Sequence, residues 1–167
     1  VPTFSGASRV VLAGASAGGY GATYNWERVQ RAFGNLRVDL IDDSGTFMPA
    51  SIVSPTSTNE QLRATNWNIA ATLPPGCTAC SNGLDNLFGY YATSLPNHRA
   101  ALLSYRPDST LSAFYQISLA NFSAGLDQVV LQHFDPFPDR RYFVATGPGH
   151  VLFGQPGLVS GGVSVET

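Results

Sequence analysis

The sequence predicts an α/β fold in which a mostly parallel sheet is flanked by helices. Apolar, β-branched runs at residues 9–14 and 36–41 enclose a segment with helical periodicity. A strand, a helix and a strand in this order form a βαβ unit, and such units build parallel sheets. Two further runs, at residues 99–105 and 141–146, supply more strands. No change in composition marks a second domain, so we expect one compact unit.

The first βαβ unit is the clearest part of the pattern. Residues 9–14 read Arg-Val-Val-Leu-Ala-Gly, which is typical of a buried strand closed by small residues. The next helix is predicted by apolar side chains that recur on one of its faces: Ala22, Trp26, Val29 and Phe33. Gly34 supplies a C-terminal stop, and residues 36–41 form the second strand.

Residues 46–98 interrupt this regular pattern, because they contain several prolines and many Ser, Thr and Asn residues. We expect an insertion or lid-like region over the sheet edge, with helices at residues 61–73 and 84–95. Regular elements then return in the order strand, short helix, helix, strand: residues 99–105, 109–116, 126–133 and 141–146.

Charge and composition exclude several classes of protein. The net charge is −2 and the charged residues are scattered, so no basic stripe can neutralise nucleic-acid phosphates. All 9 basic residues are arginine, and the absence of lysine excludes a P-loop and Schiff-base chemistry. No apolar run approaches the roughly 20 residues of a membrane span. The 44% of hydrophobic residues suffice for a packed core.

Residues 14–18 (Gly-Ala-Ser-Ala-Gly) lie between the first strand and the helix. In this context G-x-S-x-G holds its serine on a tight strand-to-helix turn above the sheet. Ser16 is therefore the candidate nucleophile, and the N–H of Ala17 is a candidate oxyanion donor. The alternative is a turn that binds phosphate or only packs tightly, although Tyr24 replaces the third glycine of a dinucleotide fingerprint. Tyr20 is a candidate substrate-pocket residue, with a core role as its alternative.

A serine nucleophile needs a base, and the base needs an orienting acid. In an α/β-hydrolase the chain order is serine, acid, histidine. His150 follows the last predicted strand in a glycine-rich loop, whereas His98 and His133 are expected at the surface or as caps. Asp108 follows the preceding strand and is the favoured acid, although it could merely cap the helix after it. Asp43, at the end of the second strand, is the alternative acid, and the adjacent Asp42 also competes for this role.

Cys77 and Cys80 form a C-x-x-C pair. This spacing fits a redox site, half of a zinc site or a disulfide. No second pair completes a zinc site, and the cysteines follow Pro-Pro-Gly in a loop rather than a strand. We favour a disulfide in an exported protein, which indicates an oxidising compartment.

Together these segments resemble the pectin acetylesterase and Notum family of carboxylesterases, particularly its bacterial members. The resemblance rests on five segments in the family's order: residues 10–22, 41–45, 73–80, 104–115 and 147–150. It implies that Ser16 is the nucleophile, Asp108 the acid and His150 the base. It also implies a secreted or exported (extracellular or periplasmic) protein without metal or organic cofactor. Members remove acyl groups from carbohydrate or protein substrates, acetyl from pectin being the namesake activity.

One departure from the family concerns its upstream elements. The family's first strands, and the glycine-rich loop that supplies a second oxyanion donor, belong before the nucleophile, whereas only a short segment precedes Ser16 here. We therefore expect a partial α/β-hydrolase fold with its N-terminal strands missing. Residues 1–167 would be the C-terminal portion of a single domain that an N-terminal segment completes. Because losing one oxyanion donor costs about 10²–10³ in kcat, we expect little activity from the isolated chain.

The expected function is a serine carboxylesterase that removes acyl groups, acetyl above all, from a carbohydrate or a related ester. One alternative is a lipase or polyester depolymerase that acts on longer or polymeric esters. Another is a non-catalytic carbohydrate-binding or interaction module. A series of esters with acyl chains of increasing length distinguishes the first alternative from a deacetylase. Labelling by a fluorophosphonate probe distinguishes a serine hydrolase from the second alternative.

Overall fold

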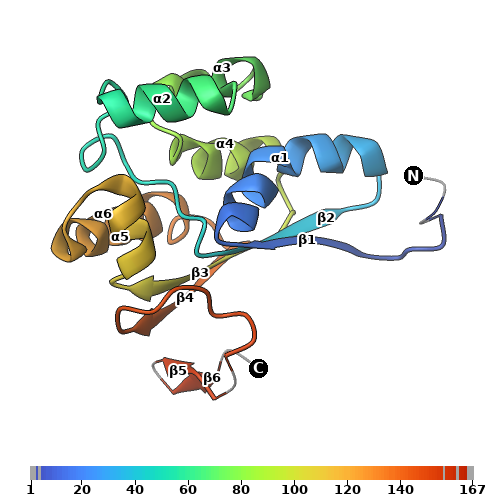
Figure 1. The fold of residues 1–167 in the computed structure, drawn as a ribbon. Helices are drawn as coiled ribbons and strands as arrows, with labels where there is room; N and C mark the ends of the chain where they lie inside the picture. The colour runs from blue at the N-terminus through green and yellow to red at the C-terminus, as the bar shows by residue number, and fades with distance from the viewer. Residues whose placement is uncertain (1–2, 4, 156, 161, 165–167) are drawn as a thin grey trace.

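The fold is built on a four-stranded sheet in which all neighbouring strands are parallel (Figure 1). This computed structural model describes residues 3, 5–155, 157–160 and 162–164. The strands lie side by side in chain order: β1 (Val10–Ala15), β2 (Val38–Asp43), β3 (Ala100–Arg106) and β4 (Arg140–Thr146). The predicted α/β fold is therefore confirmed, and each of these strands lies where the sequence placed it to within two residues.

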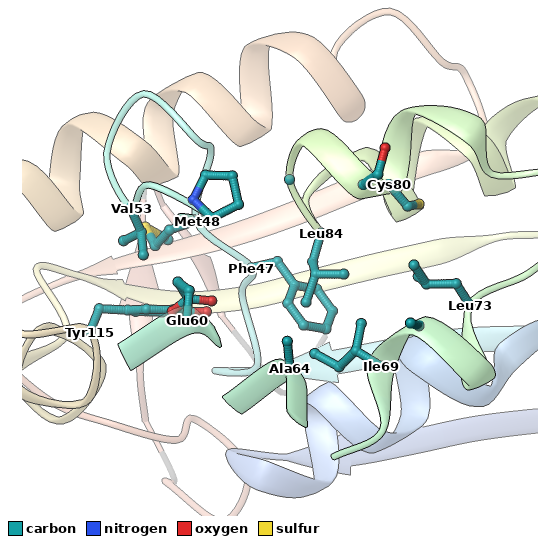
Figure 2. Close-up of a pocket in the computed structure, with 14 residues that line it drawn as sticks. Phe47, Met48, Val53, Glu60, Ala64, Ile69, Leu73, Cys80, Leu84 and Tyr115 are labelled. Carbon is teal, nitrogen blue, oxygen red and sulfur yellow. The ribbon is translucent and has the colours of Figure 1, made fainter. Parts of the chain in front are cut away.

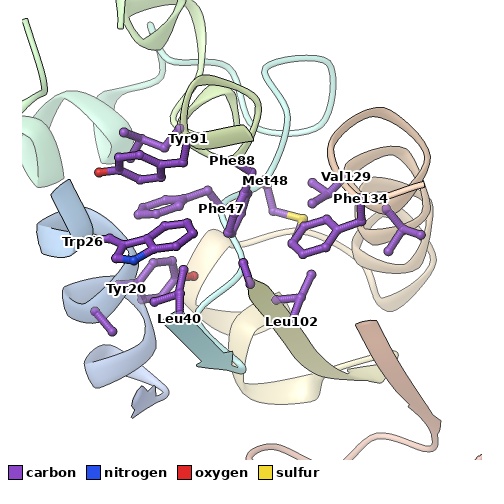
Figure 3. Close-up of a cluster of buried hydrophobic side chains, with 14 of the residues drawn as sticks. Tyr20, Trp26, Leu40, Phe47, Met48, Phe88, Tyr91, Leu102, Val129 and Phe134 are labelled. Carbon is purple, nitrogen blue, oxygen red and sulfur yellow. The ribbon is translucent and has the colours of Figure 1, made fainter. Parts of the chain in front are cut away.

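The main core lies between this sheet and three helices on one of its faces (Figure 3). Helix α1 (Ala17–Phe33) connects β1 to β2 and packs on both. Helix α4 (Asn86–Ser94) lies beside α1, and α6 (Leu119–His133) lies beside α4. Several large side chains in this core are almost fully buried: Trp26, Leu40, Tyr91, Leu102, Phe122 and Phe134. Burial of each such side chain stabilises the fold by about 1.5–3 kcal/mol, so the helices are held firmly on the sheet.

The region between β2 and β3 is helical but broken into short pieces. It contains α2 (Thr58–Asn66), α3 (Ile69–Thr72), a 3₁₀ helix η2 (Thr78–Asn82) and then α4. The single helix predicted at residues 61–73 is two helices, because Asn68 between them has a left-handed backbone with φ of 51°. Cys77 and Cys80 form the predicted disulfide. An insertion or lid-like role for residues 46–98 stays a prediction.

Helix α6 begins at Leu119, seven residues earlier than the predicted start at residue 126. Its N-terminus is capped by Ser118, whose side chain accepts a hydrogen bond from Asn121 N–H at 3.1 Å. Gly125 is buried within the helix. A Cβ there would lie 2.7 Å from the sulfur of Met48, so glycine allows the chain after β2 to cross α6 closely. The short helix α5 (Ser109–Tyr115) begins after Asp108, as predicted.

The opposite face of the sheet is covered only in part by the described residues. Tyr105, Ala145 and Leu152 form a second small core. The C-terminal hairpin of β5 (Val159–Ser160) and β6 (Val163–Ser164) lies below β3 and β4 in Figure 1. Strand β1 is at the edge of the sheet, and its Val11 is 42% exposed. That an upstream segment completes the fold remains a prediction. No helix in the described part of the chain combines the length and apolarity that crossing a membrane requires.

Candidate active site

Ser16 occupies a sharp turn between β1 and α1. Its backbone has φ of 57° and ψ of −122°, an uncommon conformation for a residue other than glycine. The turn is tied to the sheet by a hydrogen bond of 2.7 Å from Ser16 N–H to the carbonyl of Asp43. Gly14 is required in this turn, because a Cβ there would collide with the carbonyl group of Gly18. This is the strand-to-helix turn that the G-x-S-x-G sequence predicted.

The structure brings Ser16, Asp108 and His150 together at the carboxyl ends of their strands. Ser16 follows β1, Asp108 follows β3 and His150 follows β4. The Oγ atom of Ser16 lies 2.8 Å from Nε2 of His150, and Nδ1 of the same ring lies 2.7 Å from Oδ2 of Asp108. The Asp108 side chain is fully buried and that of His150 is 17% exposed. A continuous chain of hydrogen bonds therefore runs from a buried carboxylate to a partly accessible serine.

Asp108 performs both of the roles that its sequence position suggested. Its Oδ1 accepts a hydrogen bond of 2.9 Å from Leu111 N–H and so caps α5, while Oδ2 faces His150. Because an ionised carboxylate can only accept hydrogen bonds, the proton of a neutral His150 lies on Nδ1. Its Nε2 is then an acceptor that faces the hydroxyl of Ser16.

Asp43, the alternative acid, makes different contacts. Its carboxylate accepts hydrogen bonds from the backbone N–H groups of Leu152, at 2.8 Å, and Phe153, at 2.6 Å. The geometry therefore pairs His150 with Asp108 and leaves Asp43 bound to the loop that follows the histidine. Nothing in the local sequence indicated these contacts, because Asp43 and Leu152 are 109 residues apart.

Asp42, one residue before it, is also buried and points to the helix-covered side of the sheet. Its two carboxylate oxygens accept hydrogen bonds from the Thr23 hydroxyl, at 2.7 Å, and from Gly45 N–H, at 2.9 Å. Desolvation by burial raises the pKa of Asp42 to about 7, although these two hydrogen bonds favour its charged form. Asp42 thus ties α1, just beyond the nucleophile turn, to the chain after β2.

The other two histidines do not reach this site. His98 is half-buried, and its Nε2 lies 2.8 Å from the side-chain oxygen of Gln30. His133 was expected at the surface or as a cap, and the surface interpretation was wrong. It is 8% exposed at the end of α6, with Nε2 3.2 Å from Oδ2 of Asp85. Two histidines, the buried His133 and the partly exposed His150, thus face a buried carboxylate, and among the described residues only His150 has a serine next to it.

Ala17 is the first residue of α1, so no carbonyl of the helix itself can accept its N–H. The positive end of the helix dipole lies at the same place and favours a developing negative charge. The position is therefore suited to an oxyanion donor.

Tyr20 has features of both interpretations considered for it. It is 6% exposed and packs in the core, where its ring meets Phe47 edge-on at a centroid distance of 4.9 Å. Its phenol oxygen lies 2.8 Å from that of Tyr115, and both hydroxyls contact the carbonyl of Thr46. Burial raises the pKa of Tyr20 well above its ordinary value, which keeps the phenol protonated. Tyr20 also lines a surface hollow.

That hollow has a volume of about 380 Å³ and begins at Ala17, beside the nucleophile turn. It runs along α1 toward α3, and aromatic rings and two polar side chains form most of its wall: Tyr20, Tyr24, Trp67, Asn25 and Arg28. Trp67 is 45% exposed, a large fraction for so large an apolar ring. Neither Tyr24 nor Trp67 could be recognised as a pocket residue from the sequence, because Tyr24 lies within α1 and Trp67 is the residue that ends α2.

A second pocket, of about 240 Å³, lies between the loop after β2 and the short helices (Figure 2). Its wall is mainly apolar and includes Phe47, Ile69, Leu84 and Tyr115, while Ser16, Asp108 and His150 do not line it. Tyr115 lines this pocket and its hydroxyl contacts that of Tyr20, which lines the first hollow.

The parallel sheet, its crossover helix and the serine turn at the end of β1 define the α/β-hydrolase class of fold. A family model described as pectinacetylesterase matches residues 3–121 of the chain. The chain therefore belongs to the pectinacetylesterase family, whose members are carboxylic ester hydrolases and typically extracellular. The matched range contains Ser16 and Asp108, and His150 lies beyond it. A search of curated proteins found no match.

Proposed function

We propose that this protein is a serine acetylesterase that acts on acetylated carbohydrate through Ser16, His150 and Asp108. Family membership supports esterase activity on carbohydrate acetyl esters in general. The observation that carries the mechanism is the unbroken contact series from Asp108 through His150 to Ser16, at 2.7 and 2.8 Å. These distances lie within hydrogen-bond reach, which a general base needs in order to activate a nucleophile.

In the first step, Oγ of Ser16 attacks the carbonyl carbon of the acetyl ester while Nε2 of His150 accepts the hydroxyl proton. The resulting tetrahedral oxyanion accepts a hydrogen bond from Ala17 N–H at the start of α1. The buried carboxylate of Asp108 stabilises the imidazolium that forms. His150 then gives its proton to the sugar oxygen, the carbon–oxygen bond of the ester breaks, and an acetyl group remains on Ser16.

In the second step, a water molecule attacks the acetyl group while His150 accepts one of its protons. Collapse of the second tetrahedral intermediate releases acetate and returns the proton to Oγ of Ser16. The same three side chains serve both steps, so their mutual distances need not change between them.

The hollow beside Ala17 supports a carbohydrate as the alcohol part of the ester. Sugar rings present C–H faces and hydroxyl groups, and the hollow offers the exposed ring of Trp67 next to the polar side chains of Asn25 and Arg28. Aromatic faces combined with a few polar groups are typical of small-molecule binding sites. We infer that the sugar chain lies along α1 with its acetyl group at Ser16.

The apolar pocket in Figure 2 favours a second candidate, an esterase for longer acyl chains. Apolar groups such as Phe47 and Leu84 would surround such a chain. The two candidates are separated by a series of nitrophenyl esters from acetate to decanoate. A preference for acetate supports the acetylesterase, whereas a preference for the long esters supports the alternative.

We propose that the protein is exported. The disulfide between Cys77 and Cys80 would persist in an oxidising compartment and is consistent with the extracellular location typical of the family.

The Ser16→Ala variant tests the proposed mechanism in the protein with any upstream segment present, since little activity is expected of residues 1–167 alone. We expect it to lose hydrolysis of nitrophenyl acetate and of acetylated carbohydrate, together with labelling by a fluorophosphonate probe, while its melting temperature stays close to that of the wild type. Undiminished activity in Ser16→Ala would overturn the mechanism. A wild-type protein that the probe never labels would instead support a non-catalytic binding module.

A further inference from the structure

We propose that Asp43 is a positioning residue that holds the His150 loop at the working distance from Ser16. The proposal rests on the function proposed above. Asp43 contacts neither the Oγ of Ser16 nor the ring of His150, so it is not itself a catalytic residue. It acts through the backbone on both sides of the site.

The Asp43 side chain binds the loop that follows His150. Its side chain is fully buried at the end of β2 and accepts hydrogen bonds from Leu152 N–H and Phe153 N–H, at 2.8 and 2.6 Å. The neighbouring Ser44 donates its hydroxyl to the Asp43 carboxylate at 3.0 Å and accepts from Val151 N–H at 3.1 Å. Three consecutive N–H groups that directly follow His150 are therefore bound by this one pair of side chains.

The second observation is that Asp43 also binds the nucleophile turn. Its backbone carbonyl accepts the hydrogen bond from Ser16 N–H at 2.7 Å, and it pairs with Ala15 in the register of β1 and β2. One residue thus connects the backbone of the nucleophile with the backbone that follows the base. The distance between Ser16 and His150 depends on this connection.

The third observation concerns the loop itself. Val151, directly after His150, has φ of 65°, a conformation that a β-branched residue rarely adopts. Such a conformation persists only where the surroundings over-determine it. The segment from residue 147 to residue 158 has no strand or helix among its described residues, so it has no regular ladder to fix it. The hydrogen bonds to Asp43 and Ser44 supply this constraint.

The test compares Asp43→Ala with Asp39→Ala in the otherwise unchanged protein. Asp39 is a matched control because it is buried on the same strand, accepts a hydrogen bond from Arg99 N–H at 3.0 Å, and lies at the opposite end from the site. For each variant we would measure the melting temperature, kcat and KM on nitrophenyl acetate, and the low-field proton resonance of the His150 Nδ1–H. The resonance is assigned by its absence from His150→Gln.

For Asp43→Ala we expect kcat to fall about 10²-fold with KM little changed, because misplacement of a catalytic group by about 1 Å has this effect. The His150 resonance should shift or broaden at a temperature where the variant is fully folded. Asp39→Ala should lose stability but keep kcat and the resonance. Asp43→Asn, which retains one acceptor oxygen for the loop, should recover part of the lost rate.

The proposal is overturned if Asp43→Ala has the same kcat as Asp39→Ala. It is also overturned if the rate of Asp43→Ala falls only in proportion to the fraction of that variant that is folded, while the His150 resonance stays in place. If Asp43→Ala does not fold, Asp43→Asn decides, and an unchanged kcat and resonance in that variant overturn the proposal. Ser16→Ala, measured in the same assay, tests the proposed mechanism separately. If Ser16→Ala loses activity while Asp43→Ala keeps full activity, the positioning role of Asp43 is rejected and the proposed mechanism stands.

Discussion

Asp108 uses one carboxylate oxygen to cap helix α5 and the other to orient His150. The first oxygen accepts Leu111 N–H at 2.9 Å, and the second lies 2.7 Å from Nδ1 of the histidine. The two tasks differ in what they require. A cap needs any acceptor oxygen, whereas the base needs an acceptor that keeps the imidazole proton on Nδ1.

The Asp108→Asn variant should separate these tasks. The amide oxygen can still cap α5, so we expect a melting temperature close to that of the wild type. The amide NH₂ would then face Nδ1 of His150 as a donor, which drives the imidazole proton to Nε2 and leaves no acceptor for the Ser16 proton. We expect kcat to fall by about 10⁴-fold, the order known for this change in a serine protease.

Asp108→Ala should lose both the rate and the cap, with about 1 kcal/mol of stability lost through the cap alone. Ser118→Ala is the matched control, because it removes only the cap of α6, an interaction of 3.1 Å with Asn121 N–H. Thermal unfolding and nitrophenyl acetate kinetics on the three variants provide the measurement. A normal kcat in Asp108→Asn would show that the orientation of His150 does not limit the reaction.

His133 should behave in the opposite way to His150. The pair formed by His133 and Asp85 is buried at 3.2 Å but has no serine beside it among the described residues. We expect His133→Gln to lower stability by about 1.5–3 kcal/mol, the usual loss for a hydrogen bond to a charged group, and to leave kcat within a few-fold of the wild type. Urea unfolding measures the loss of stability, and nitrophenyl acetate kinetics with fluorophosphonate labelling measures whether the active site is intact. Loss of labelling in the folded variant would indicate that the second pair is functional.

The nucleophile turn could be predicted from the sequence because all of its determinants are local. Gly14, Ser16 and the start of α1 lie within a few residues, and the strand and helix on either side were readable from their periodicity. Asp108 and His150 could be found by chain order and by their positions after strands, although the sequence left Asp43 as an alternative acid.

The role of Asp43 could not be predicted, because its partners at Leu152 and Phe153 are more than 100 residues away and offer only backbone N–H groups. Backbone donors leave no trace in residue identity. His133 was misplaced for a related reason, since its burial depends on how α6 meets α4. The sequence placed the start of α6 seven residues too late. Gly125 inside this helix packs closely against Met48, a contact that only the tertiary structure shows.

The stability of the protein should depend on pH through Asp42. Burial raises the pKa of this carboxyl in the folded protein from an ordinary value of 3.8 to about 7. The folded state therefore holds a proton more tightly than the unfolded state, and the resulting stabilisation is fully present below about pH 3.8. It is lost as the pH rises through about 7, where the buried carboxylate becomes charged.

The Asp42→Asn variant isolates this effect, because an amide can keep the contacts with Gly45 N–H and the Thr23 hydroxyl but cannot ionise. We expect the wild type to lose stability relative to Asp42→Asn between about pH 4 and pH 7, by up to roughly 4 kcal/mol for a shift of this size. Chemical denaturation of both proteins across this range gives the difference at each pH. A difference that stays constant with pH would contradict the raised pKa.

The two glycines that flank Ser16 should respond differently to alanine. A Cβ on Gly14 would collide with the carbonyl of Gly18, and this backbone atom cannot move without distorting the turn. We expect Gly14→Ala to lose about 1–3 kcal/mol of stability, as for other overpacked sites, together with most of the activity. A Cβ on Gly18 meets no atom within 4 Å, and this residue lies in the first turn of α1. Gly18→Ala should therefore fold normally and gain up to about 0.5–1 kcal/mol of stability from reduced backbone entropy in the unfolded chain.

Melting temperatures and esterase rates of both variants test this pair of expectations. Equal effects at the two positions would mean that close packing in the turn does not explain the need for Gly14.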